Sequence, residues 1–345
     1  MSNDQYELRS MASIALDVQF IWTLGLLAKF LKVFKKDLRL ARRIIENPKL
    51  EELVPVGKQE QLQTFYFGYN GFYKVIKKKK RHILAPHPHL QMIFRAINEK
   101  IIELCPAHEK AYGFVKKRNF QMAATSLIGN KHFFSFDITD AFPSITDVMI
   151  EKILFDLEVP EYLVKPLANL VTYQYQGLRR LPQGAASSPP VLNMVYKPMC
   201  EEIEAFCQKQ KINWCVYADD FTFASEVITA KEQQLLLAIP EKYGFVIKPE
   251  KTKDNFGNTI PRMLGLSIVD DRIHLKRYTK LKFSRMLFAA WKHDAYNDRQ
   301  VDGIAAVIKQ TYGEVQNWPG SLRKYWVLCI NKRQEKKRRH HEKRK

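Results

Sequence analysis

Apolar residues recur every three or four positions over long parts of the chain, a spacing that is typical of amphipathic helices. Residues 12–48 show this spacing and predict a helical N-terminal lobe, and residues 91–104 predict a second amphipathic helix. We also expect helices over residues 146–172, over residues 231–243 and through most of the chain from residue 276 onward.

Shorter apolar runs bounded by turn residues predict strands between these helices. The segments FYKVI and HIL flank the basic run 77–81 and predict two short strands, and residues 132–145 predict a buried strand that turns at Asp140. The other expected elements are a Gly/Ser/Pro loop running into a helix over 181–206, a hairpin around Ala218–Asp220 within 214–225, a strand and loop over 244–253, and a hairpin over 262–275 that turns at Asp270–Asp271.

The order of these elements lacks a regular strand–helix–strand alternation, and long helices separate the strands. This pattern favours an α+β fold that has an antiparallel sheet with helices on one side. The 345 residues, 46% of them hydrophobic, suffice for one large domain with lobes or for two to three subdomains. The longest apolar stretch, Val18 to Ala28, is too short to span a bilayer, and no signal peptide is predicted.

The charge balance indicates a polyanionic partner. The chain carries 56 Lys and Arg against 36 Asp and Glu, a formal net charge of +20. Because these cations are clustered, nucleic acid is the simplest partner. Two interpretations stay open for the basic helix face from Lys32 to Arg43, which are contact with RNA and a solvated surface. The five cysteines show no CxxC or metal-ligand spacing, which indicates reduced thiols in a cytosolic protein.

The segment VYADDFTF places Asp219 and Asp220 side by side in an apolar run. Such a pair becomes tolerable when divalent cations neutralise it, and Mg²⁺ shares carboxylate ligands of this kind with substrate phosphates. Asp137, in the apolar segment FFSFDITDAF, is the natural third carboxylate. Each motif alone has a simpler interpretation, a turn for the Asp pair and a helix cap or salt-bridge partner for Asp137. The combination of two aspartate-bearing strands, a PQG loop between them and a basic run upstream favours the metal site.

Five segments occur in an order that resembles the sequence blocks of reverse transcriptases, and the bacterial retron-type branch, related to group II intron enzymes, fits best. They are F-D-I-x-D-A-F-P-S-I (136–145), L-P-Q-G-x-x-x-S-P (181–189), Y-A-D-D (217–220), G-F-V-I-x-P-x-K-T (244–252) and M-L-G-L (263–266). The segments KKKKRHILAPHPHLQMIFRAI and HEKAYGFVKKRN resemble the upstream blocks of that branch.

The resemblance implies a right-hand polymerase fold with fingers, an antiparallel-sheet palm and a helical thumb. The implied units are a helical N-terminal extension over 1–60, fingers and palm over 61–275, a thumb over 276–330 and a basic C-terminal tail over 331–345.

The resemblance also implies roles for individual residues. Asp137, Asp219 and Asp220 would hold two Mg²⁺ ions, with Mn²⁺ as an alternative ion, and the carbonyl of Ile138 would be a further ligand. Phe142 would pack where a ribose 2′-hydroxyl projects, so that the product would be DNA. The other implied roles concern the nucleotide, the primer and the RNA. Arg81 and one of Lys77 or Lys78 would bind the triphosphate, Asp140 and Ala141 would line the sugar pocket, Gln183 would contact the nucleotide, and Gly184 would allow its backbone to approach closely. Tyr217 would contact the primer, Lys251 would be a general acid, and Lys116, Lys117 and Arg118 would contact RNA.

The activity that the resemblance implies is RNA-directed DNA synthesis from dNTPs on a bound, structured non-coding RNA. The setting it implies is a retron-like antiviral defence system in the bacterial cytoplasm, with an effector protein as a further partner and no membrane. Two alternatives stay open. One is protein-primed or untemplated DNA synthesis at the same active site, and the other is a catalytically silent RNA-binding scaffold.

Overall fold

The computed structural model describes residues 64–67, 73–78, 81–86, 88–175, 178–256, 262–263, 266–269 and 271–342. The helical lobe predicted over 12–48 and the extension over 1–60 lie outside the described residues. Within the described part, no helix is long and apolar enough to cross a membrane.

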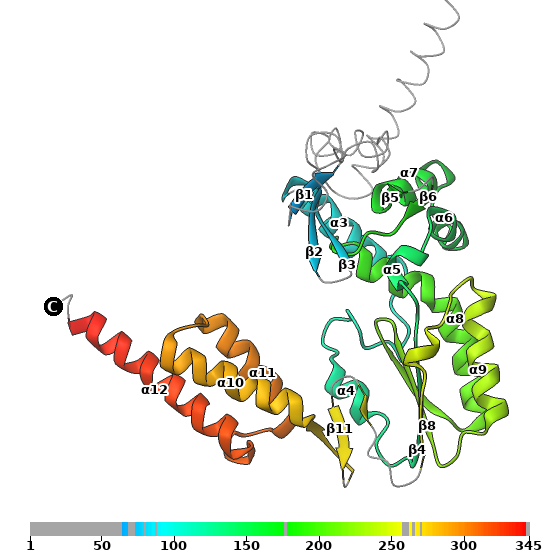
Figure 1. Ribbon diagram of the computed structural model, residues 1–345. Coiled ribbons are helices and arrows are strands. Elements are labelled where there is room, and N and C mark those ends of the chain that lie inside the picture. Colours follow the sequence, from blue (N-terminus) through cyan, green and yellow to red (C-terminus); the bar gives the residue numbers. More distant parts are fainter. Residues whose placement is uncertain are drawn as a thin grey trace, which may run out of the picture.

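A three-stranded antiparallel sheet, β1-β2-β3, lies at the top of the molecule in Figure 1. Strand β2 pairs with β3 so that Lys78 lies opposite Arg81, and the two described ends of the predicted basic run therefore lie within these strands. Helix α3 follows and buries Ile93, Phe94 and Ile97 in the main hydrophobic core, which confirms the predicted amphipathic helix. The bounds are β1 Thr64–Phe67, β2 Tyr73–Lys78, β3 Arg81–Pro86 and α3 Pro88–Leu104.

A four-stranded antiparallel sheet in the order β7-β8-β4-β9 carries both aspartate-bearing strands. Because successive side chains of a strand point to opposite faces, Phe134 and Phe136 of β4 share one face. Phe221 and Phe223 of β8 join them in the main core cluster. Phe133, one position out of phase, packs into a second cluster on the other face. The bounds are β4 His132–Asp137, β7 Asn213–Tyr217, β8 Asp220–Ser225 and β9 Lys253–Asn255.

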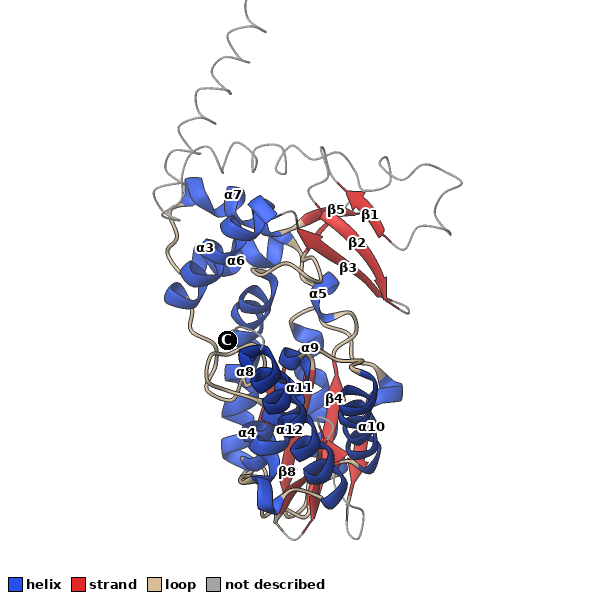
Figure 2. Ribbon diagram, turned by 90° about the vertical axis from the view of Figure 1, so that its left-hand side faces the viewer, coloured by secondary structure: helices blue, strands red, loops and turns tan. Residues whose placement is uncertain are grey.

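Helices cover both faces of this sheet, and the two views agree that it lies between α8 and α9 on one side and α10–α12 on the other (Figures 1 and 2). The short helix α4 also packs on the second face, where Ala123 and Ala124 are fully buried. The prediction of helices on one side was therefore wrong, because the predicted C-terminal helices pack on the second face together with α4, and α4 is too short to show a helical period. The bounds are α4 Phe120–Thr125, α5 Ala141–Ser144, α6 Asp147–Asp156, α7 Glu161–Val171, α8 Ser188–Gln210 and α9 Ala230–Lys242, with a small hairpin of β5 Tyr173–Tyr175 and β6 Leu178–Arg180 after α7.

The second hydrophobic cluster joins the central sheet to the C-terminal helices. Phe133 and Cys215 of the sheet pack in the same cluster as Leu287, Ile304 and Leu322 of α10, α11 and α12. The hairpin predicted over 262–275 is confirmed and connects the two parts. The bounds are β10 Arg262–Met263, β11 Leu266–Val269, β12 Arg272–Leu275, α10 Arg277–His293, α11 Asp298–Tyr312 and α12 Gly320–Glu342.

Residues 244–253 differ from the predicted strand and loop. Ile247 makes a single β-bridge to Ile138, and the 3₁₀ turn η2, Pro249–Lys251, follows before the short strand β9. Pro249 has no backbone N–H to donate to a sheet, and it fits the first position of a helical turn. Phe245 and Ile247 of this segment pack against the main core, Val246 is exposed, and the segment joins the sheet through this single bridge only.

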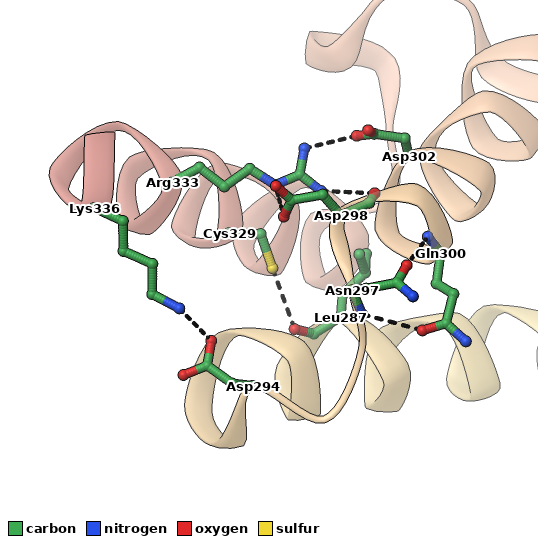
Figure 3. Close-up of polar contacts among 9 residues, drawn as sticks. All are labelled: Leu287, Asp294, Asn297, Asp298, Gln300, Asp302, Cys329, Arg333 and Lys336. Atoms are coloured by element: carbon green, nitrogen blue, oxygen red, sulfur yellow. Dashed lines mark hydrogen bonds and ion pairs between the residues drawn. The ribbon is translucent and has the colours of Figure 1, made fainter. Parts of the chain in front are cut away.

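Helix α12 passes through residue 330 without a break, so the predicted boundary between thumb and tail falls inside a helix. Two of its basic residues contact the connection between α10 and α11 and the start of α11 (Figure 3). Lys336 Nζ lies 2.8 Å from Asp294 Oδ1, and the Arg333 guanidinium lies 2.7 Å from carboxylate oxygens of both Asp298 and Asp302. The first part of the predicted tail is thus held against the helical bundle.

Truncation measures how much these ion pairs contribute to stability. Removing residues 331–345 deletes the ion pairs of α12, and we expect the free energy of unfolding to fall by about 1 to 2 kcal/mol, because partly exposed pairs are individually weak. Removing only residues 337–345 keeps these pairs and should leave stability unchanged. Urea denaturation of both truncated proteins is the measurement. Equal stabilities would show that the ion pairs contribute nothing.

Candidate active site

The antiparallel register of β4 and β8 brings the predicted acidic residues to one end of the central sheet. Asp137, the last residue of β4, pairs in register with Asp220, the first residue of β8. The Ile138 N–H donates to the Asp219 carbonyl oxygen at 3.0 Å, so the two segments stay joined beyond the strands. Ala218 closes the turn between β7 and β8 with a left-handed φ of +59°. Asp137 and the adjacent pair Asp219–Asp220, which are far apart along the chain, are thus neighbours in space.

Strand alternation keeps these carboxylates out of the phenylalanine core. Asp137 has the same parity as Phe133 along β4, and Asp220 is one position out of phase with Phe221. Both side chains therefore point away from the face that carries Phe136. The strands can be almost entirely apolar on one face while presenting acids on the other.

The environment of Asp220 disfavours its charged form. The pKa of this carboxyl is raised from 3.8 to about 6, chiefly because the group is buried. Nearby Lys253 opposes the shift, and the charges of Asp137 and Asp219 contribute to it. The charged form of this buried carboxyl is unfavourable beside two other carboxylates. Such an arrangement is typical of a site that binds a cation, because the cation would neutralise the charges.

Two lysines neutralise Asp137. Lys251 Nζ donates a hydrogen bond to Asp137 Oδ2 at 2.6 Å, and Lys248 Nζ lies 3.5 Å from Oδ1. Sequence analysis missed Lys248. The two lysines are three residues apart across the 3₁₀ turn η2, a spacing that brings side chains onto the same face. That spacing was the available signal, but it depended on recognising the turn.

The oxygen donors fit a hard divalent cation. Asp137 Oδ1 is buried and accepts no hydrogen bond, since its contact with Lys248 is an ion pair without hydrogen-bond geometry. An unsatisfied buried carboxylate oxygen beside two further carboxylates is the chemistry that Mg²⁺ favours. Among the described residues, no three acidic, His or Cys side chains are arranged to hold a metal. The metal site therefore stays a prediction.

The segment after β4 carries the predicted sugar pocket. Asp140 adopts a left-handed φ of +43° and starts the short helix α5, in which Ala141 is buried. Phe142 is half-buried and packs against the main core. Its ring lies edge-on to that of the exposed Phe114, with 6.1 Å between the centroids. The assignment of Phe142 as a gate stays a prediction.

The PQG loop joins the β1–β3 sheet to the rest of the site. The Leu84 N–H donates to the carbonyl oxygen of Gln183 at 2.8 Å. Gly184 has φ +125°, and a Cβ at this position would lie 2.7 Å from Ile83 Cγ2 and 2.8 Å from the Leu84 oxygen. A glycine is required here because β3 approaches the loop backbone too closely for any side chain.

Replacing this glycine should loosen the contact between β3 and the PQG loop. We expect Gly184→Ala to lower the free energy of unfolding by about 2 kcal/mol, from backbone strain plus the steric clash. Gly129→Ala is a matched control, since Gly129 also has positive φ but no atom would lie within 4 Å of its Cβ. The control should cost about 1 kcal/mol from strain alone. Equal losses in urea denaturation would contradict the close approach.

Other predicted site residues lie on strands β2 and β3 and at the end of β7. The backbones of Lys77, Lys78 and Arg81 lie in the β2–β3 hairpin, and their side chains are outside the described part of the structure. Tyr217 ends β7, and its ring lies edge-on to that of Phe120 at 6.4 Å. The proposed roles of these residues stay predictions.

The three basic residues of segment 116–118 differ in their surroundings. Lys116 and Lys117 are exposed, as expected for RNA contacts. Arg118 is half-buried, and its Nη1 donates to the carbonyl oxygens of His108, Glu109 and Ala111 at 3.0, 2.8 and 2.7 Å. The structure therefore gives Arg118 a role in bracing its own loop, which the prediction of RNA contact did not include.

Comparison with known proteins identifies the class to which this fold and these residues belong. A family model described as reverse transcriptase (RNA-dependent DNA polymerase) matches residues 76–268. The chain therefore belongs to the reverse transcriptase family. The fold is the right-hand polymerase fold with fingers, an antiparallel palm and a helical thumb, as the motifs predicted.

The similar proteins are of the retron type. The retron Mx65 reverse transcriptase of Myxococcus xanthus is 26% identical over 247 residues, which is 66% of this chain and 58% of that protein. The retron Mx162 enzyme of the same organism is 27% identical over 216 residues, covering 55% and 44% of the two chains. The retron Ec86 reverse transcriptase of Escherichia coli is 24% identical over 203 residues, covering 58% and 62%. The chain thus spans about half of the length of the curated relatives that it matches.

Among solved structures, telomerase from Candida albicans in complex with a fragment of telomeric RNA matches with a TM-score of 0.46 and 11% sequence identity. The match covers 75% of this chain and 56% of that chain.

Proposed function

We propose that this chain is an RNA-directed DNA polymerase that extends a primer with dNTPs on a bound, structured non-coding RNA. The observation that carries the proposal is the register that pairs Asp137 with Asp220 at one end of the sheet, with Asp219 joined to Ile138 beside them. The family match over residues 76–268 and the retron-type relatives support it.

Asp137, Asp219, Asp220 and the carbonyl of Ile138 would hold the divalent ions, two Mg²⁺ by analogy with the chemistry of phosphoryl transfer. When bound, these ions supply activation of the attacking hydroxyl and neutralisation of phosphate charge. Lys248 and Lys251 form ion pairs with Asp137, and in the proposed reaction their charges would lie beside the phosphates of the incoming nucleotide. Lys251 holds a proton at Nζ that can be donated to the leaving pyrophosphate.

The proposed sugar contact is tested at Phe142. We expect Phe142→Ala to raise incorporation of UTP relative to dTTP by about tenfold or more, because a ring excludes a hydroxyl mainly by steric overlap. The measurement is the ratio of kcat/KM for the two nucleotides on poly(rA) primed with oligo(dT). An unchanged ratio would place the sugar discrimination elsewhere.

Sequencing the nucleic acid that copurifies with the full chain tests the function as a whole. A defined small RNA covalently joined to complementary DNA supports the proposal. Homopolymeric DNA would instead support untemplated synthesis, and DNA linked to the protein would support protein priming. RNA with no DNA and no metal-dependent incorporation would support a silent scaffold. The proposed setting is a bacterial cytoplasmic defence system with an effector partner, and it is tested by phage sensitivity of cells that carry the Asp219→Ala variant.

A further inference from the structure

The loop over residues 110–118 is fastened to the strand that precedes the catalytic turn. The Tyr112 N–H donates to the Val216 carbonyl oxygen at 2.8 Å, and the Val216 N–H donates to the Lys110 oxygen at 2.9 Å. Ala111 makes a parallel bridge to Val216 between these two bonds. With the Arg118 carbonyl contacts, this loop has a fixed backbone rather than that of a free surface loop.

At Gly113 the loop is in direct contact with the turn between β7 and β8, which carries the Asp pair. A Cβ on Gly113 would lie 2.2 Å from the Ala218 nitrogen and 3.0 Å from the Tyr217 carbonyl carbon. On the opposite side, Asn193 of α8 donates to the Gly113 carbonyl oxygen at 3.1 Å. The position of the next residue is therefore set by the catalytic turn itself.

That next residue is Phe114, which has a left-handed φ of +60° and is 50% exposed. A bulky residue in this conformation is sterically costly, and half-exposure returns little hydrophobic stabilisation. Its one ring partner among the described residues is Phe142, at 6.1 Å and an interplanar angle of 64°. The fixed backbone of the loop thus holds an exposed aromatic ring beside Phe142.

We propose that Phe114 is a positioning residue for sugar selection, which holds the ring of Phe142 from the side of the catalytic turn. The edge-on contact restricts the rotation of the half-buried Phe142 ring toward the space that a ribose 2′-hydroxyl would need. This inference rests on the proposed role of Phe142 as the sugar gate. It adds a second aromatic residue, outside the motif that contains Phe142, to the determinants of dNTP preference.

The test measures kcat/KM for dTTP and UTP on poly(rA)·oligo(dT) with Phe114→Ala, Phe114→Tyr and Phe142→Ala. We expect Phe114→Ala to reduce the preference for dTTP by about two- to tenfold, the range of an aromatic pair contact, with kcat for dTTP largely kept. Phe114→Tyr keeps the ring and should keep the preference. Phe155→Ala is the matched control, because Phe155 is an exposed phenylalanine of α6 for which no ring contact with Phe142 is found.

The double variant Phe114→Ala with Phe142→Ala separates an indirect role from a direct one. If Phe114 acts through Phe142, the double variant should be no less selective than Phe142→Ala alone. Additive losses would show that Phe114 meets the nucleotide itself and would overturn the positioning role. An unchanged preference in Phe114→Ala, with a reduced preference in Phe142→Ala, would overturn this inference and leave the proposed function intact. An unchanged preference in Phe142→Ala would remove the gate and this inference together.

Discussion

Asp137→Asn is expected to reduce dNTP incorporation by about a thousandfold or more while RNA affinity stays within about twofold. The amide keeps the shape of the side chain but removes the charge that would hold a divalent ion, a contribution of several kcal/mol to the transition state. It also leaves Lys248 and Lys251 without their shared carboxylate. The measurements are incorporation of labelled dTTP on a primed RNA and RNA binding by filter retention.

Glu250→Gln is a matched control for this experiment. Glu250 lies in the same 3₁₀ turn as Lys251 and is exposed, so its replacement removes one negative charge near the site without touching Asp137. The control should retain incorporation. Activity retained in Asp137→Asn would take this residue out of the metal site, and equal losses in both variants would indicate a general charge effect.

Asp220→Asn should make the metal-free protein more stable at neutral pH and also inactive. A pKa raised from 3.8 to about 6 in the folded state means that stability is highest when the carboxyl is protonated. Stability is then lost as pH rises from about 4 to about 6, and the loss persists above that range. A pKa difference of this size corresponds to about 3 kcal/mol. We therefore expect the variant to gain up to about 3 kcal/mol at neutral pH, and to gain nothing near pH 4.

Urea denaturation in EDTA at several pH values measures this gain. Asp271→Asn provides the control, because Asp271 is exposed in a turn with φ +52°, a conformation that asparagine also tolerates. Added Mg²⁺ should stabilise the original protein and have no comparable effect on Asp220→Asn. If the two carboxyl-to-amide changes alter stability equally at all pH values, the burial of Asp220 does not carry the effect.

Much of the fold could be predicted from the sequence because its elements are long or strongly patterned. Helix α3 follows an apolar period, and the β7–β8 hairpin follows from turn residues between apolar runs. Helix α4 and the turn η2 could not be predicted in the same way, since six and three residues are too few to show a period. Their form is decided by packing against the sheet and by a proline.

The candidate site was predictable where chemistry requires a particular residue at a particular spacing. The three carboxylates and the glycine of the PQG loop satisfy that condition. Lys248, the carbonyl contacts of Arg118 and the left-handed backbone of Phe114 do not, because each depends on neighbours far away in the sequence or on a backbone angle. The amino-acid sequence around these three residues therefore contains no pattern from which their contacts or backbone conformation could be predicted.

The alternation of β4 and β8 links folding fidelity to catalysis. A slip of either strand by one residue would turn its aspartate into the phenylalanine layer and its phenylalanines toward the opposite layer. Such a molecule would lose its hydrophobic interior and its acidic cluster in one step. A copy of the chain with this incorrect pairing would therefore lose both its stability and the acidic cluster on which the proposed activity depends. The free energy that favours the correct register of β4 and β8 therefore also keeps the three aspartates together.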